Sequence, residues 1–471
     1  MHELVNLAVL ALIFVLAAGE ITDPDFFWHM AAGRLMWQTH TIPRADPFSF
    51  TARGREWVCH EWGSELIMYG LWRAAGEAGL IGLSALAITC AFALVLARCS
   101  RDANGEIPPY AAAAATLLAA LSSLPTWGVR PQMATLLFAS LTLYILERGK
   151  PLWLVPLQAL WVNMHGGFPL GPTLTFAFAL GTAIEGWRAG SPTARLQARK
   201  EFARLLPVGT AQIAASLVNP YGPRMLIYPI QTLTSSAMRQ YIVEWHSPNF
   251  HEVGFLPLAM LILALLGTSA LSRKRPPAPQ LILLLGATYA ALSSARHIPF
   301  LAITGAPALS KGLSELGGGR RRRPQTASRP AAIGLALAVI AILSTACAWR
   351  LKAAAEGSSA AQMKHYPVRA VDFMEAQHIT GHVFNRYSWG GYLIWRGRKP
   401  FIDGRADVYG EFLKTYVEIY NARVSPHETF EEYDITCALV EAKSPIATLL
   451  RESGWQRVYQ DELAAVFLKG E

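Results

Sequence analysis

The pattern of apolar and polar positions divides the chain into two parts. Up to about residue 350, long apolar runs alternate with short polar segments, whereas residues 351–471 mix the two kinds of position as a soluble domain does. A bilayer core of about 30 Å requires about 20 apolar residues per helix. Eleven runs reach or approach this length and predict membrane-spanning helices: 4–21, 77–97, 109–125, 132–147, 151–164, 168–186, 205–218, 254–271, 280–295, 298–311 and 331–349.

Basic residues alternate between the loops and predict an orientation. If the N-terminus lies inside, the strongly basic loops all fall on the inner side, as the positive-inside rule requires. These loops contain Arg98 and Arg101; Arg148 and Lys150; Arg188, Arg195, Arg199, Lys200 and Arg204; Arg273, Lys274 and Arg275; and Arg320–Arg323. The N-terminus is then cytoplasmic and the C-terminal part extracytoplasmic.

The first outer loop, residues 22–76, has a helical pattern of its own. It opens with Thr22-Asp23-Pro24-Asp25 and continues with a stripe of Phe26, Met30, Gly33 and Trp37 at helical spacing. A turn-rich piece around Asp46 follows, and a second helix begins near His60-Glu61-Trp62 with Trp62, Leu66 and Tyr69 on its apolar side. Amphipathic helices rich in Trp and Tyr lie in the membrane interface. We therefore divide the chain into a transmembrane bundle at 1–350, whose first outer loop forms two interfacial helices, and an extracytoplasmic α/β domain at 351–471.

The C-terminal domain has the alternating pattern of a small mixed sheet with helices. The pattern predicts helices at 367–378, 411–423 and 445–453. It predicts strands at 382–384, 399–402, 435–441, 455–460 and 464–468.

Composition supports a membrane protein. Hydrophobic residues make up 52% of the chain and charged residues 16%, against about 25% charged residues in soluble proteins. This excludes a disordered chain and argues against a soluble enzyme. The net charge of +9 is explained by the inner loops, so no nucleic-acid partner is predicted. The five cysteines have neither disulfide-framework nor zinc-finger spacing.

Two carboxylates stand where the first helix leaves the membrane. Asp23 and Asp25 are our candidates for catalysis, because an acid at the bilayer edge is costly unless it has a function. An Asp before a helix is also a common N-cap, and the residues alone do not separate the two roles. His29 follows Asp25 by four residues and can share its helix face.

Other polar groups gather at the predicted outer ends of helices. Each one alone is explained by a cap, a turn or a snorkelling cation. Together they predict a cavity at the membrane surface that suits a substrate with an anionic head and a lipid tail. The candidates for substrate binding are His29, His60, Glu61, Arg130, Asn163, His165, Glu244, His246, Arg296 and His297.

The C-terminal domain adds two polar segments rich in glycine and aromatic residues. One contains Asn385 and Trp389, and the other contains Asp403 and Arg405. Such segments suit sugar binding and loop anchoring equally well, so these four residues join the binding candidates.

Several motifs resemble a known superfamily. They are Asp23-x-Asp25-x-x-Trp28-His29, Asp46-Pro47-Phe48-Ser49, Trp161-x-Asn163-x-His165-Gly166 and Asp403-Gly404-Arg405. With the helix pattern, the interfacial first loop and the outer domain, they resemble the glycosyltransferase C superfamily, which includes oligosaccharyltransferases, protein O-mannosyltransferases and aminoarabinose transferases. They are also similar to a group of bacterial multi-pass proteins. The Trp-Trp-Asp motif of oligosaccharyltransferases is absent, and the Asp-Glu pair of O-mannosyltransferases is Asp-Pro-Asp here.

The resemblance implies transfer of a sugar from a polyprenyl-phosphate donor to a lipid, glycan or protein acceptor at the outer face of the bacterial cytoplasmic membrane, with inversion. A carboxylate would serve as general base, and cations or a divalent metal would stabilise the leaving phosphate. Asp23 is favoured as base because the Asp-Pro of oligosaccharyltransferases aligns with it, and Asp25 is second. A metal bridging the two acids is left open. The alternatives are a transporter or flippase of lipid-linked intermediates, which would favour inverted repeats, and a non-catalytic envelope assembly protein.

Overall fold

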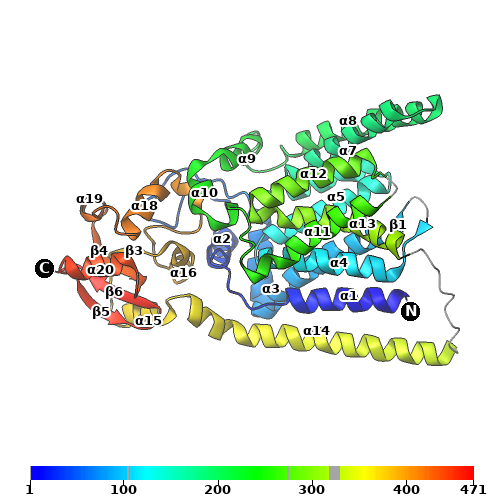
Figure 1. The fold of residues 1–471 in the computed structure, drawn as a ribbon. Coiled ribbons are helices and arrows are strands. Elements are labelled where there is room, and N and C mark those ends of the chain that lie inside the picture. Colours follow the sequence, from blue (N-terminus) through cyan, green and yellow to red (C-terminus); the bar gives the residue numbers. More distant parts are fainter. Residues whose placement is uncertain (1, 103–104, 273–274, 318–328, 471) are drawn as a thin grey trace. The chain divides into compact units, whose positions relative to one another are not determined.

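The computed structural model describes residues 2–102, 105–272, 275–317 and 329–470. The basic residues Arg273, Lys274 and Arg320–Arg323 lie outside these ranges. The chain folds into two compact units (Figure 1). The helical unit comprises 1–19, 81–229 and 244–353, and the mixed unit comprises 20–80, 230–243 and 354–471.

Helices form almost all of the helical unit. They are α1 (His2–Ala17), the later part of α3 (Trp62–Cys99), α4 (Pro109–Ser123), α5 (Gln132–Glu147), α6 (Leu154–Trp161), α7 (Leu170–Arg188), α8 (Pro192–Ala215), the start of α9 (Arg224–Thr234), α11 (Leu256–Leu271), α12 (Ala278–Ser293), α13 (Ile298–Leu316) and the first part of α14 (Arg329–His365). Two short strands, β1 (Arg101–Asp102) and β2 (Gly105–Glu106), pair antiparallel. Helix α13 packs against α4, α11 and α12, and α7 packs against α8 and α12.

Each predicted membrane run contains a helix, but several bounds differ; α14, for example, continues to His365. Helix α6 is only 8 residues long. Helix α8 begins at Pro192 rather than near 205, because the charged segment before the apolar run is also helical and hydropathy does not detect such an extension. Among the described residues, three helices are long and apolar enough to cross a membrane: 62–99, 253–271 and 336–365. The number of eleven spans therefore stays a prediction.

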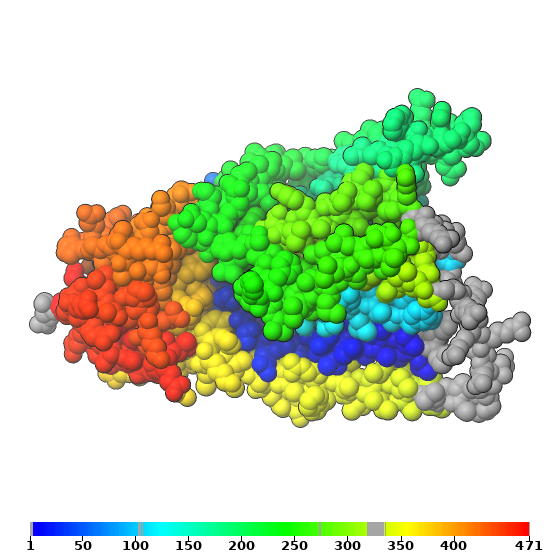
Figure 2. Space-filling model, viewed as in Figure 1, coloured from blue at the N-terminus to red at the C-terminus, as the bar shows by residue number. Residues whose placement is uncertain are grey.

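Helix α14 shows the apolar surface expected of a helix in lipid. The apolar window of its 336–365 stretch has none of its residues buried inside the structure. Figure 2 shows this helix in yellow with its side chains open to the surroundings. In water such a surface would be unfavourable, so α14 fits a membrane environment.

The first loop and the C-terminal domain belong to the same compact unit. Helix α2 (Phe26–Thr39) and the first part of α3 are the two helices predicted for the loop, and α3 breaks at Gly76, whose φ is 59°. Helix α2 buries Phe26 and Met30 and packs against α16 (Gly390–Trp395) of the C-terminal domain. This grouping differs from the sequence-based division, which placed the loop with the bundle. The grouping follows from side-chain packing between segments that are far apart in the sequence, such as α2 and α16.

The sheet of the C-terminal domain is small and mixed. Its order is β3-β4-β6-β5, with β3 (His382–Asn385) parallel to β4 (Ile435–Glu441) and with β6 (Ala464–Leu468) antiparallel to both β4 and β5 (Gln456–Gln460). The remaining helices of the mixed unit are α10 (Ser236–Tyr241), α15 (Val368–Ala376), α17 (Ala406–Tyr409), α18 (Phe412–Tyr420), α19 (His427–Glu432) and α20 (Pro445–Glu452).

One local prediction is wrong. The segment 399–402 makes only an isolated bridge between Val383 and Pro400. The carboxamide of Asn385 instead accepts from the N–H of Phe401 and donates to the carbonyl of Ile402, so a side chain replaces the strand ladder. On the second loop helix, Tyr69 is buried and Trp62 and Leu66 are partly buried, and Glu65, which the pattern did not place on this side, is buried as well.

Candidate functional site

The acidic motif shapes the start of α2. The Asp23 carboxylate accepts a hydrogen bond from the N–H of Asp25 at 2.9 Å, and the Asp23 carbonyl accepts from the N–H of Phe26. Asp23 therefore acts as a local cap that orients the first turn. The Asp25 carboxylate accepts from the indole N–H of Trp28 at 3.0 Å. Both acids are partly exposed.

Two glycines of the C-terminal domain lie directly against this turn. A Cβ at Gly404 would collide with Oδ1 of Asp25 and would stand 3.0 Å from the indole nitrogen of Trp28. A Cβ at Gly391 would stand 3.0 Å from the carbonyl oxygen of Pro24. The collision would require a shift of the carboxylate, so the absence of a side chain at Gly404 lets the C-terminal domain support Asp25 closely.

We expect Gly404→Ala to displace Asp25 and to destabilise the unit by about 1–3 kcal/mol, the usual cost of overpacking. The apparent Tm of the purified full chain, followed by tryptophan fluorescence, measures this change. Gly190→Ala is the control, because a Cβ at Gly190 meets nothing within 4 Å. Equal Tm values for the two variants would contradict the close contact.

Next to the acidic motif, a histidine and two glutamates meet in the interior. Nδ1 of His29 lies 3.0 Å from Oε1 of Glu65 and 3.5 Å from Oε2 of Glu61. All three side chains are buried. His29 and Glu61 were predicted from the sequence and Glu65 was not, although its position one helical turn after Glu61 is the signal that could have identified it.

Two further groups border this cluster. Nε2 of His60 lies 3.4 Å from Oε1 of Glu61, and the Cys59 thiol donates to Oε2 of Glu65 at 3.0 Å. Burial by itself lowers the pKa of His60, but the Glu61 carboxylate and other acceptors raise it to about 9. Burial also lowers the pKa of His29, but the carboxylates of Glu61 and Glu65 outweigh this effect and raise the pKa above its usual value. The cluster thus has a negative potential that attracts positive charge.

A buried ion-pair network joins two of the sequence motifs. The Arg405 guanidinium donates to Asp46 at 2.7 Å and to both oxygens of Asp403, at 2.8 and 2.7 Å. It also lies 4.7 Å from the ring centre of Trp57. Burial lowers the pKa of Arg405, but the two carboxylates raise it well above its usual value. The side chains of Asp46, Asp403 and Arg405 are fully buried, and their bonds tie the first loop to the C-terminal domain.

The other two binding candidates of this domain are also buried. Asn385 joins the end of β3 to the segment at 401–402, as described above. The Trp389 indole donates to the carbonyl of His365. Both arrangements are typical of loop anchoring, one of the two interpretations that the sequence left open.

The remaining candidates lie in the helical unit. Arg130 donates to Glu244 at 2.6 Å. The guanidinium of Arg296 lies 4.5 Å from the ring centre of Trp245. His246 is exposed. The pKa of His297 is lowered, mainly by burial and to a smaller extent by the positive charge of Arg296.

Helix α6 is followed by a turn that orients His165. Nδ1 of His165 accepts from the N–H of Gly167 at 2.9 Å and lies 2.7 Å from Oγ1 of Thr135. A neutral His165 therefore has its proton on Nε2, which is a donor. Asn163 donates to the carbonyls of Ala159 and Val218 and connects this turn to the end of α8.

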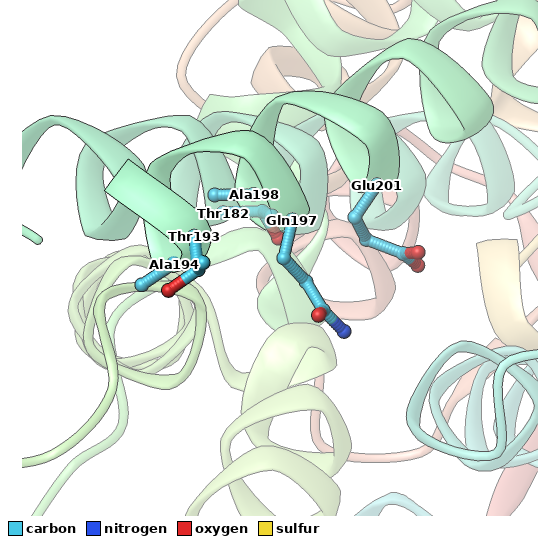
Figure 3. Close-up of a pocket in the computed structure, with 6 residues that line it drawn as sticks. All are labelled: Thr182, Thr193, Ala194, Gln197, Ala198 and Glu201. Atoms are coloured by element: carbon cyan, nitrogen blue, oxygen red, sulfur yellow. The ribbon is translucent and has the colours of Figure 1, made fainter. Parts of the chain in front are cut away.

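The predicted residues thus form two sets, one in each unit. A cavity of about 530 Å³ between α7 and α8 contains none of them (Figure 3). Its lining residues are Thr182, Thr193, Ala194, Gln197, Ala198 and Glu201. The acidic motif and the neighbouring histidine–glutamate cluster therefore remain our candidate for the functional site within the described residues.

Comparisons with known proteins identify the class of fold. No family model and no curated protein matches the sequence. Among solved structures, the archaeal oligosaccharyltransferase AglB from Archaeoglobus fulgidus, in complex with an inhibitory peptide and a dolichol-phosphate, matches with a TM-score of 0.56 and 12% identity over 94% of this chain and 69% of that chain. ArnT from Cupriavidus metallidurans bound to undecaprenyl phosphate matches with a TM-score of 0.49 and 14% identity over 98% of this chain and 97% of that chain.

The similarity to AglB confirms the predicted fold. The chain shares the fold of AglB, a multi-pass α-helical bundle with a small C-terminal α/β domain.

Proposed function

We propose that this protein is a membrane glycosyltransferase that moves a sugar from a polyprenyl-phosphate donor to an acceptor hydroxyl of a lipid, glycan or protein. The reaction takes place at the outer face of a bacterial cytoplasmic membrane, with the N-terminus inside and the C-terminal domain outside. The observation that carries the proposal is the acidic turn at the start of α2, supported by Gly404, in a fold shared with an oligosaccharyltransferase.

The reaction that fits this turn is a single displacement. The acceptor oxygen forms a bond to the anomeric carbon, the bond from that carbon to the phosphate oxygen breaks, and the acceptor proton passes to a carboxylate. One attack inverts the anomeric configuration. The polyprenyl phosphate leaves with its negative charge, which cationic groups stabilise.

Asp25 is the better candidate for the base on structural grounds, although the sequence favoured Asp23. The Asp23 carboxylate caps the N–H of Asp25, a role that needs an acceptor and no proton transfer. The Asp25 carboxylate is oriented by the Trp28 indole and by the close approach of Gly404. A base held in this way is positioned before the substrate arrives.

The test is an assay of donor cleavage by the purified full chain in liposomes. A panel of polyprenyl-phosphate pentoses and hexoses is supplied with lipid, glycan and peptide acceptors, and released polyprenyl phosphate is measured by mass spectrometry. We expect release with at least one donor and a product of inverted configuration by NMR. Movement of intact donor between leaflets, without cleavage of any donor in the panel, would contradict a transferase and support a transporter.

A further inference from the structure

The cluster next to the acidic turn is built from two helices in close contact. Gly33 permits this approach, because a Cβ there would collide with the carbonyl oxygen of Glu65. His29 lies one turn before Gly33 on α2, and Glu61 and Glu65 lie one turn apart at the start of α3. One nitrogen and two carboxylates therefore face each other across the contact.

The spacing of the facing atoms is close to that of metal ligands, although the shortest distance is that of a hydrogen bond. In tetrahedral zinc sites the ligand atoms lie about 2.0–2.2 Å from the metal, which places neighbouring ligand atoms about 3.3–3.6 Å apart. Nδ1 of His29 is 3.5 Å from Oε2 of Glu61 and 3.0 Å from Oε1 of Glu65. The potential ligand atoms of the three residues all lie within 4.8 Å of one another.

The outer oxygens of the two carboxylates are held by neighbouring residues. Glu61 presents Oε2 to His29 and Oε1 to His60, whereas Glu65 presents Oε1 to His29 and Oε2 to the Cys59 thiol. Such outer contacts orient carboxylates in metal sites. They leave one oxygen of each glutamate directed at the same nitrogen.

A proton serves this geometry less well than a divalent cation. Nδ1 of His29 can carry one proton, which can bond well to one of the two carboxylates but not to both. Two buried carboxylates are also costly unless their charge is compensated, and the second histidine of the cluster, His60, is paired with Glu61. A divalent cation would contact all three ligand atoms and neutralise both charges.

We propose that Nδ1 of His29 and one oxygen each of Glu61 and Glu65 bind a divalent transition-metal cation, of which Zn²⁺ fits the nitrogen and oxygen ligands best. Three protein ligands leave a fourth position for water or a substrate oxygen, as in catalytic zinc sites. The proposed site neighbours the acidic turn, because its ligand His29 follows Asp25 by one helical turn. The site differs from the Asp23–Asp25 bridge that the sequence left open.

The experiment measures metal in the tag-free full chain, purified in detergent without chelator. Mass spectrometry of the metal content should find one Zn²⁺ or a similar cation per chain, and chelation followed by Zn²⁺ should lower and then restore the apparent Tm. Glu65→Gln should weaken Zn²⁺ binding by more than 10–100-fold, which is the typical effect of losing a residue that only hydrogen-bonds to a metal ligand. Glu452→Gln is the matched control, because Glu452 is exposed at the end of α20, and it should bind metal like the wild type.

A spectroscopic measurement on the wild type does not depend on the folding of the variants. The chelated chain with Co²⁺ should show the visible d–d bands of a tetrahedral N/O site, and Zn²⁺ should abolish them. Absence of bound metal in the purified chain, together with no Tm change and no Co²⁺ bands, would overturn the proposal and leave a histidine–carboxylate ion-pair network. Full binding by both Glu65→Gln and Glu61→Gln would overturn the ligand assignment.

Discussion

Replacing Asp25 with Asn should lower the rate of sugar transfer by about 10²–10⁴-fold, the usual effect of losing a general base. The amide has almost the same shape as the carboxylate, and its oxygen can still accept from the Trp28 indole. The turn should therefore keep its conformation, while the ability to take the acceptor proton is lost. Initial rates of polyprenyl-phosphate release, at equal amounts of folded protein, measure the effect.

Asp23→Asn is the matched control for this result. The amide oxygen introduced by this substitution would still accept from the N–H of Asp25, as the Asp23 carboxylate does, because Asn forms the same side-chain-to-backbone turn as Asp. Transfer should change little. The opposite result, with activity lost at Asp23 and kept at Asp25, would exchange the roles of the two acids. Full activity in both variants would move the base elsewhere, with Glu61 and Glu244 next to be tested.

Replacing Arg405 with Gln should destabilise the chain by about 3–5 kcal/mol, the typical cost of removing one partner from a buried ion pair. The substitution leaves Asp46 and Asp403 buried without the guanidinium that pairs with both. It also removes the contact with Trp57. We expect a marked fall in apparent Tm and loss of the protection that the first loop and the C-terminal domain give each other against proteolysis.

Arg457→Gln controls for the loss of an arginine, because Arg457 is exposed on β5, and exposed substitutions usually change stability by no more than about 0.5 kcal/mol. Adding Asp46→Asn to Arg405→Gln should recover part of the loss, since one buried charge is then removed. Additive losses in this double-mutant cycle would show that the two side chains do not interact. Equal Tm values for Arg405→Gln and Arg457→Gln would contradict a stabilising role for the network.

The helices and most strands could be predicted because their signals are local. A run of apolar residues or a helical period identifies an element within one window of sequence. The run 132–147 coincides with α5, and the predicted strand 435–441 coincides with β4. The prediction of a strand at 399–402 failed because a group distant in sequence, the Asn385 carboxamide, takes the backbone hydrogen bonds at 401–402.

The site could be predicted only in part for the same reason. The sequence identified Asp23 and Asp25 because an acid at the end of an apolar helix is costly without a function, and it added His29 and Glu61 as polar groups of the same outer loop. It did not identify Glu65, which looks like one more polar position on an amphipathic helix. Its burial and its 3.0 Å approach to His29 arise only when α2 packs on α3.

The sequence by itself therefore determined the multi-pass helical fold, the α/β character of the C-terminal domain and the acidic turn, because each depends on neighbouring residues. Only the tertiary structure decided which groups meet. Arg405 pairs with Asp46 across 359 positions of sequence. Gly404 of the C-terminal domain lies against the Asp25 carboxylate of the first loop. Contacts of this kind depend on the packing of whole elements, which no window of sequence contains, and they decide how the acidic turn is supported.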